Sequence, residues 1–173
     1  MDDASALLLP GRPEEGKELP RVRGRRYDRA RVEPTVPLDC VAFLLVSDGC
    51  VLVEKRKLTK RLAPGALAIP GGHVNAAEDV EEALRREAAE ELAIVPREVA
   101  FVCTLMHLAE ELRRLHYFAV RRWEGRIEPA EADAIVWVPL EAVARLDFDV
   151  DRTAVNEYVR LSREGGLAWR TNR

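Results

Sequence analysis

Apolar residues in this chain come in short runs separated by turn residues, a pattern that is typical of β-strands. An uninterrupted apolar run covers residues 41–46, and Asp48-Gly49 after it favours a two-residue hairpin turn into the next run. The pattern predicts strands at residues 41–46, 50–53, 67–69, 99–108, 115–123 and 134–138. It predicts helices at residues 79–93, 139–146 and 151–163.

The first predicted helix is built from strong helix formers, but its polar residues are unusually placed. At about 100° per residue, Val80 and Leu84 form an apolar stripe. Glu87, Glu90 and Glu91 share an arc of about 100° that overlaps this stripe. A helix face that should pack against a core therefore carries three like charges.

Such a carboxylate cluster is costly unless a positive group neutralises it, because like charges repel and half-buried carboxylates are poorly solvated. A hard divalent cation would neutralise it, and oxygen-only ligands suit Mg²⁺ or Mn²⁺. The alternative is an exposed helix face on which the glutamates pair with Arg85 and Arg86. The helix alone leaves both interpretations open.

The spacing before the helix favours the metal site. Two glycines open the segment GGHVNAAEDVEEALRREAAEELAI, which ends at Ile94. This segment resembles the Nudix box, whose pattern is G, five residues, E, seven residues and then R-E-U-x-E-E-x-G-U, with U aliphatic. The fixed positions of the pattern are met by Gly72, Glu78, Arg86, Glu87, Glu90 and Glu91. The last glycine is replaced by Ala93, which would resist a positive φ angle.

The resemblance implies an α/β fold, the Nudix-type α/β/α sandwich with a mixed β-sheet. It also implies a hydrolase of a nucleoside diphosphate linked to another moiety, with Mg²⁺ as cofactor and Mn²⁺ as an alternative. Implied metal ligands are Glu78, Glu87, Glu90 and Glu91. Glu87 is the first choice for the general base, with Glu110 or Glu111 in reserve, and Arg86 is expected to orient a box carboxylate.

Four residues outside the carboxylate set are predicted to bind substrate. Gly71 and Gly72 would let the backbone approach a metal-bound phosphate closely. Arg56 lies in a basic segment that leads into the site, and it could meet substrate phosphates or lie in a solvated loop. The resemblance to Nudix domains implies that Trp137 lies near the nucleotide base, although an amphipathic Trp also suits a core.

The box and the compact size resemble nucleoside triphosphate pyrophosphohydrolases of the MutT-like group, which release a nucleoside monophosphate and pyrophosphate. An oxidised purine nucleotide such as 8-oxo-dGTP is the first expected substrate. ADP-ribose or a dinucleoside polyphosphate is the enzymatic alternative. A non-catalytic nucleotide sensor or RNA-associated module is the alternative of another class, but the complete set of box carboxylates favours an enzyme.

The remaining sequence predicts one domain, at residues 36–173, after a Pro- and Arg-rich arm at residues 1–35. The arm could bind RNA, yet a net charge of −3 does not support general nucleic-acid binding, so we expect it to wrap the domain or a partner subunit. No apolar run is long enough for a membrane span, and a cytoplasmic protein is expected. By analogy with Nudix enzymes, a homodimer is also expected.

Overall fold

The computed structural model describes residues 36–171, and the predicted arm at residues 1–35 lies outside them. The strands are β1 (Leu38–Ser47), β2 (Cys50–Arg56), β3 (Leu67–Ala68), β4 (Gly71–His73), β5 (Val95–Leu108), β6 (Leu112–Glu124), β7 (Ala132–Pro139) and β8 (Arg170–Thr171). The helices are α1 (Val80–Leu92), the 3₁₀ helix η2 (Leu140–Arg145) and α2 (Asp149–Glu164).

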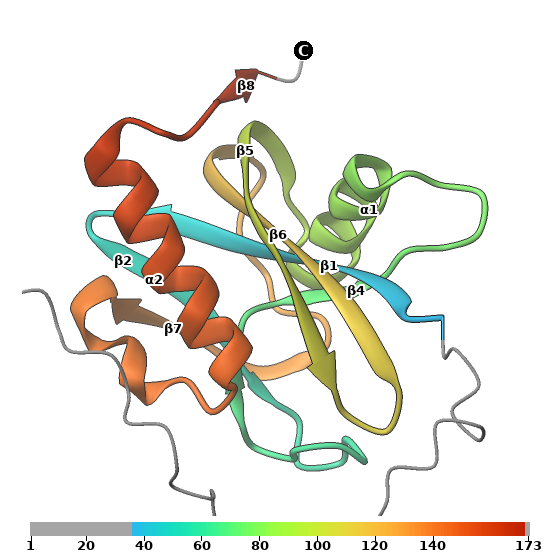
Figure 1. Ribbon diagram of the computed structural model, residues 1–173. Coiled ribbons are helices and arrows are strands. Elements are labelled where there is room, and N and C mark those ends of the chain that lie inside the picture. The colour runs from blue at the N-terminus through green and yellow to red at the C-terminus, as the bar shows by residue number, and fades with distance from the viewer. Residues whose placement is uncertain (1–35, 172–173) are drawn as a thin grey trace, which may run out of the picture. The chain divides into compact units, whose positions relative to one another are not determined.

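The strands form a mixed sheet with the order β3-β2-β1-β6-β5-β8 (Figure 1). β1 pairs with β6 in parallel, whereas the other pairs are antiparallel. Off the main path, β4 pairs with β1 and β7 pairs with β2. β1 is therefore the strand at which the different parts of the sheet meet.

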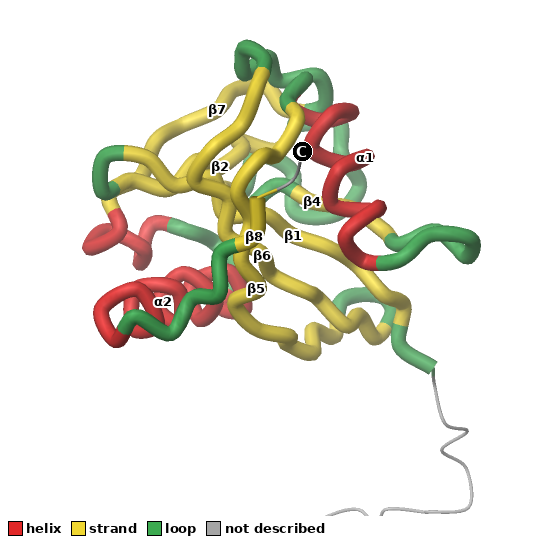
Figure 2. The backbone as a smooth tube through the Cα atoms, turned by 90° about the horizontal axis from the view of Figure 1, so that it is seen from above, coloured by secondary structure: helices red, strands yellow, loops and turns green. Residues whose placement is uncertain are grey.

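The two α-helices lie on opposite sides of the strands (Figures 1 and 2). One core cluster joins α1 to residues such as Phe43 and Val120, and the other joins α2 to residues such as Leu44 and Ala119. Consecutive residues of β1 thus point to different cores, as the alternation of a strand requires. The predicted α/β/α sandwich with a mixed sheet is confirmed.

The predicted hairpin turn is present between β1 and β2. Asp48 and Gly49 both have positive φ angles, 49° and 73°, which is the geometry of a type I′ turn. After the pairs Val46–Val51 and Ser47–Cys50, β1 leaves β2 and pairs with β4, where Ala42 lies opposite Gly71. A β-carbon on Gly71 would lie 2.1 Å from the Val41 carbonyl oxygen, so this close approach requires glycine.

The predicted first helix is confirmed, and its start has a clear physical cause. Asp79 is the N-cap: its carboxylate accepts hydrogen bonds from the backbone amides of Glu81 and Glu82, and the Glu82 side chain reaches back to the Asp79 amide. The predicted helix at 139–146 is instead a short 3₁₀ helix, and non-helical backbone angles at Ala142 put a kink in it. Among residues 36–171, no helix is long and apolar enough to cross a membrane.

Candidate active site

A cavity of about 690 Å³ opens between the sheet, the C-terminal half of α1 and the start of α2. Besides the reserve base Glu110, six of the predicted site residues line it: Arg56, Gly71, Gly72, Glu87, Glu90 and Glu91. They come from β2, β4 and α1, so the fold brings together residues that the sequence separates. Glu78, Arg86 and Trp137 are not part of the lining.

Gly72 and Glu87 are in very close contact. A β-carbon on Gly72 would lie 2.1 Å from the Glu87 Oε1 atom and 2.2 Å from its carboxyl carbon. The Glu87 carboxylate therefore lies directly over the glycine backbone at the cavity wall. Any larger residue at position 72 would displace this carboxylate.

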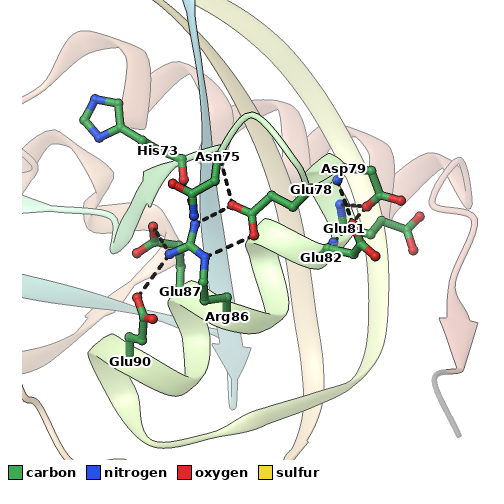
Figure 3. Close-up of polar contacts among 9 residues, drawn as sticks. All are labelled: His73, Asn75, Glu78, Asp79, Glu81, Glu82, Arg86, Glu87 and Glu90. Atoms are coloured by element: carbon green, nitrogen blue, oxygen red, sulfur yellow. Dashed lines mark hydrogen bonds and ion pairs between the residues drawn. The ribbon is translucent and has the colours of Figure 1, made fainter.

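Arg86 is the centre of a group of charged hydrogen bonds (Figure 3). Its guanidinium donates to Glu78 at 2.6 and 3.1 Å, to Glu87 at 2.8 Å and to Glu90 at 3.1 Å. It also donates to the His73 carbonyl at 2.7 Å. Arg86 thus ties the loop before α1 to two box carboxylates, which are the contacts expected of a residue that orients them. The hydrogen bonds from Arg86 lower the pKa of Glu78 to about 2.

Glu91 differs from its neighbours on α1 because Arg86 does not reach it. Burial, followed by the nearby charges of Glu54, Glu87 and Glu131, raises the pKa of Glu91 to about 8. Its Oε2 atom is buried and has no hydrogen-bond partner among the described residues. A buried carboxylate oxygen without a donor is costly, so the geometry of this oxygen suits a cation ligand.

Two carboxylates that the sequence analysis did not single out lie near Glu91. Glu54 is 7% exposed on β2, and burial raises its pKa. Glu131 lies in the loop before β7, which is fixed to the end of α1 because the amide of Ala130 donates to the Glu91 carbonyl at 3.0 Å. Glu131 pairs with Lys60 at 2.8 Å, and both line the cavity.

The wall of the cavity formed by α2 and the sheet contains a further buried acid, Asp151. The Tyr117 hydroxyl donates to its Oδ1 atom at 2.7 Å, and the Ile69 amide donates to its Oδ2 atom at 3.0 Å. Burial raises the pKa of Asp151 to about 6. Phe148 and His107 line this part of the cavity, with ring centroids 6.1 Å apart.

The remaining predicted residues have different positions. Trp137 lies away from the cavity, where its ring stacks on Trp123 with centroids 6.5 Å apart. Glu110 lines the cavity and forms an ion pair with Arg61, whereas Glu111 is not part of the lining. Glu54 directly follows the predicted strand at residues 50–53, and this adjacency to an apolar run was the signal available in the sequence.

The donor set fits a hard divalent cation, because it consists of carboxylate oxygens and includes the unpartnered Oε2 of Glu91. Among residues 36–171, however, no three His, Cys, Asp or Glu side chains converge on one point. Glu87 and Glu90 turn instead to Arg86. Arg86 contacts one oxygen of each carboxylate, so the second oxygen of Glu87 and of Glu90 remains available for a metal.

Comparisons with known proteins agree with this geometry. A family model described as NUDIX domain matches residues 37–158. The chain is 30% identical over 112 residues to a protein of Buchnera aphidicola subsp. Acyrthosiphon pisum named 8-oxo-dGTP diphosphatase, covering 64% of this chain and 87% of the relative. It is 47% identical over 52 residues to a Salmonella schwarzengrund protein named nucleoside triphosphatase NudI, covering 30% of this chain and 37% of that relative.

A similar solved structure is that of the MutT NUDIX hydrolase from Burkholderia pseudomallei. It superposes with a TM-score of 0.65 at 26% identity, covering 70% of this chain and 98% of that one. The family model spans well over half of the chain and includes the helix that carries the carboxylates. The chain therefore belongs to the NUDIX domain family and is a Nudix hydrolase, an enzyme that acts on phosphoric anhydride bonds.

Proposed function

We propose that this enzyme is a Mg²⁺-dependent nucleoside triphosphate pyrophosphohydrolase that accepts a canonical or oxidised nucleotide and releases a nucleoside monophosphate and pyrophosphate. The observation that carries the proposal is that one cavity joins two chemically different walls. One wall holds the box carboxylates together with Arg56 and Lys60, and the other is aromatic and apolar, with a buried acid. A nucleotide has the same division between its phosphates and its base.

The carboxylate wall suits the phosphates. Glu87, Glu90 and Glu91 would hold Mg²⁺, with Mn²⁺ as an alternative, and Glu78 would act through Arg86 as an outer residue. The bound ion would neutralise phosphate charge and lower the pKa of a water molecule. Arg56 supplies a positive charge beside the same wall and would orient the phosphate chain.

Glu87 remains our choice for the general base. Its carboxylate faces the Gly72 backbone at the cavity wall, where an attacking water could lie between it and a phosphate. The hydrogen bond from Arg86, at 2.8 Å, fixes the orientation of the Glu87 carboxylate. A base in a fixed orientation accepts the proton without the cost of reorganisation during the reaction.

The opposite wall suits a nucleoside. Phe148, Leu115 and Val150 provide apolar surface, and the Asp151–Tyr117 pair provides the polar groups that can fix the orientation of a base. The name of the Buchnera relative, an 8-oxo-dGTP diphosphatase, supports an oxidised purine nucleotide as the first substrate to test.

The deciding experiment is hydrolysis with Mg²⁺ across canonical and oxidised nucleoside triphosphates, ADP-ribose and dinucleoside polyphosphates, with the products identified. We expect a nucleoside monophosphate and pyrophosphate from one triphosphate class. Preferred cleavage of ADP-ribose or of a dinucleoside polyphosphate would replace our substrate assignment. Nucleotide binding without hydrolysis of any compound would contradict the proposed reaction itself.

A further inference from the structure

Arg113 is a cation that lines the cavity without an acidic partner among residues 36–171. The other cations of the cavity lining are paired: Arg56 with Glu54 at 3.5 Å and Lys60 with Glu131 at 2.8 Å. In addition, the Nε atom of Arg113 is buried and has no hydrogen-bond partner in the described part of the chain. Buried donors normally have a hydrogen-bond partner, so the unpaired Nε atom of Arg113 requires a physical explanation.

The fold holds Arg113 on the cavity side of β6. It lies opposite Leu38 of β1 and His107 of β5, the two strands that pair with β6. The acid nearest in sequence among the cavity residues, Glu110, is held by Arg61 in an ion pair. Glu110, the carboxylate that follows the end of β5, therefore does not pair with Arg113.

Arg113 and the carboxylates also face a shared region. Burial raises the pKa of the Cys40 thiol, the charge of Arg113 opposes this rise and that of Glu87 adds to it, so both side chains lie near Cys40, which is itself part of the cavity wall. Cys40 lies opposite His73, the residue after Gly72. A ligand that extends from the Glu87 carboxylate along this wall would thus reach the Arg113 guanidinium.

We propose that Arg113 is a substrate-binding residue that donates hydrogen bonds to oxygen atoms of the bound nucleotide. The inference rests on the proposed function, since a nucleotide supplies these oxygens. A guanidinium presents its N–H donors in a planar fork, which matches paired oxygen acceptors better than an ammonium does. The acceptor oxygens belong to a phosphate group or to a carbonyl of the base, and both sources offer the same chemistry to the fork.

A second point of attachment has a consequence for the reaction. Metal-bound phosphates alone would leave the rest of the nucleotide free to rotate, whereas a hydrogen bond to Arg113 fixes its orientation against the Glu87 carboxylate. Correct orientation contributes to the rate as well as to affinity. Loss of Arg113 should therefore raise KM and also lower kcat.

The chain offers a matched control in the next residue. Arg114 lies beside Arg113 on β6, is not part of the cavity lining, and binds both oxygens of Asp39, at 2.5 and 2.7 Å. Arg114→Met and Arg113→Met remove the same side chain from neighbouring positions. Arg113→Lys keeps the charge but removes the fork.

The test measures the Kd of a non-hydrolysable triphosphate analogue in the full-length protein with Mg²⁺, together with kcat and KM. Arg113→Met should weaken binding by about 10- to 100-fold, which corresponds to the loss of a charged hydrogen bond. Arg113→Lys should recover part of the affinity, and Arg114→Met should bind as the wild type does. Wild-type affinity in Arg113→Met and in Arg113→Lys would overturn the proposal.

Two simpler ligands identify the source of the oxygens. Weaker binding of inorganic tripolyphosphate by Arg113→Met would assign the acceptor to a phosphate, whereas weaker binding of the nucleoside alone would assign it to the base. If the wild type hydrolyses nucleotides and Arg113→Met matches it in every measurement, only the role of Arg113 fails. If the wild type binds and hydrolyses no nucleotide, the proposed function fails as well.

Discussion

The helices α1 and α2 each present one buried acid to the same cavity from opposite faces of the sheet. Burial is the largest cause of a raised pKa in both cases, about 8 for Glu91 on α1 and about 6 for Asp151 on α2. Their hydrogen bonds differ, however. Asp151 accepts one donor on each oxygen, whereas the Oε2 atom of Glu91 has no partner among residues 36–171.

This difference separates an acid whose oxygens are all satisfied within the protein from one that has an unpaired oxygen. Asp151 ties the segment before Gly71 to α2 through the Ile69 amide and holds the Tyr117 hydroxyl, so its burial is compensated within the protein. Glu91 is less buried as a whole than Asp151, but its Oε2 atom is buried and receives no hydrogen bond from the described residues. In the ligand-free protein a bound proton compensates for the burial of Glu91, as its raised pKa indicates, and a cation would replace that proton on binding.

The largest expected effect is on catalysis. Glu91→Gln keeps the size of the side chain and removes the ligand charge, so metal-dependent turnover should fall by at least about 100-fold. Folding should be little affected, because a pKa of about 8 leaves the metal-free Glu91 carboxyl mostly neutral at pH 7, like the amide that replaces it. The measurement is kcat/KM with Mg²⁺, alongside the urea midpoint of the metal-free protein.

Thermal unfolding tests the role of Glu91 in metal binding without measuring catalysis. Mg²⁺ should raise the Tm of the wild type, because a ligand that binds the folded state stabilises it, and this increase should be much smaller in Glu91→Gln. The Arg86 contacts do not involve Glu91, so they remain as a control within the same helix. Equal Mg²⁺ stabilisation of both proteins would remove Glu91 from the metal site.

The second effect is a pH dependence due to Asp151. Its pKa rises from 3.8 to about 6 on folding, so the folded state binds more protons than the unfolded state between about pH 4 and pH 6. This contribution to stability is present below pH 4 and is lost as the pH rises through 6. The loss is about 3 kcal/mol.

Asp151→Asn is the variant that isolates this contribution, because it cannot ionise. The difference in unfolding free energy between the wild type and Asp151→Asn should change by this amount from pH 4 to pH 7, as measured by urea titration at each pH. A constant difference over this range would show that Asp151 titrates as it does in the unfolded chain.

The third effect concerns the hydrogen bond that satisfies Asp151. Tyr117→Phe keeps the fully buried ring but removes the donor to Oδ1, which leaves a buried acceptor unpaired. We expect a loss of about 1 to 3 kcal/mol at pH 7. A protonated Asp151 is neutral and tolerates the missing hydrogen-bond donor better, so the loss of unfolding free energy should become smaller below pH 6. A cost that is independent of pH would assign it to packing of the ring.

The two acids also differ in how far a sequence could reveal them. Glu91 belongs to a motif of fixed local spacing on one helix, and the helix period alone places it beside Leu84. Asp151 reaches the cavity only because α2 packs across the sheet from residues far away in sequence. A single sequence holds no direct signal for that packing.

The same limit explains the residues that sequence reasoning placed differently. Glu54 and Arg113 enter the cavity through strand pairing, and pairing cannot be deduced from one strand alone. Trp137 was assigned to the base by resemblance, but its position on β7 directs it to Trp123. Local spacing thus predicted α1 and its carboxylates, and the opposite wall of the cavity required the structure.

The smallest expected effect lies at the ends of the two helices. Both end in a left-handed residue: α1 at Ala93, with φ 56° and ψ 34°, and α2 at Gly165, with φ 68° and ψ 20°. Ala93 bears the strain that the sequence suggested, because its β-carbon disfavours this conformation, whereas glycine adopts it readily. Ala93→Gly should therefore stabilise the protein by up to about 1 kcal/mol.

Gly165→Ala is the reciprocal change, and a β-carbon at this position would contact no atom within 4 Å. Its expected cost of about 1 kcal/mol would therefore be backbone strain alone. The urea midpoints of the two variants should move in opposite directions. If Ala93→Gly stabilises the protein without loss of turnover, the strained end of α1 is not needed to position Glu91. A loss of turnover would show that the left-handed alanine holds α1 in the position that catalysis requires.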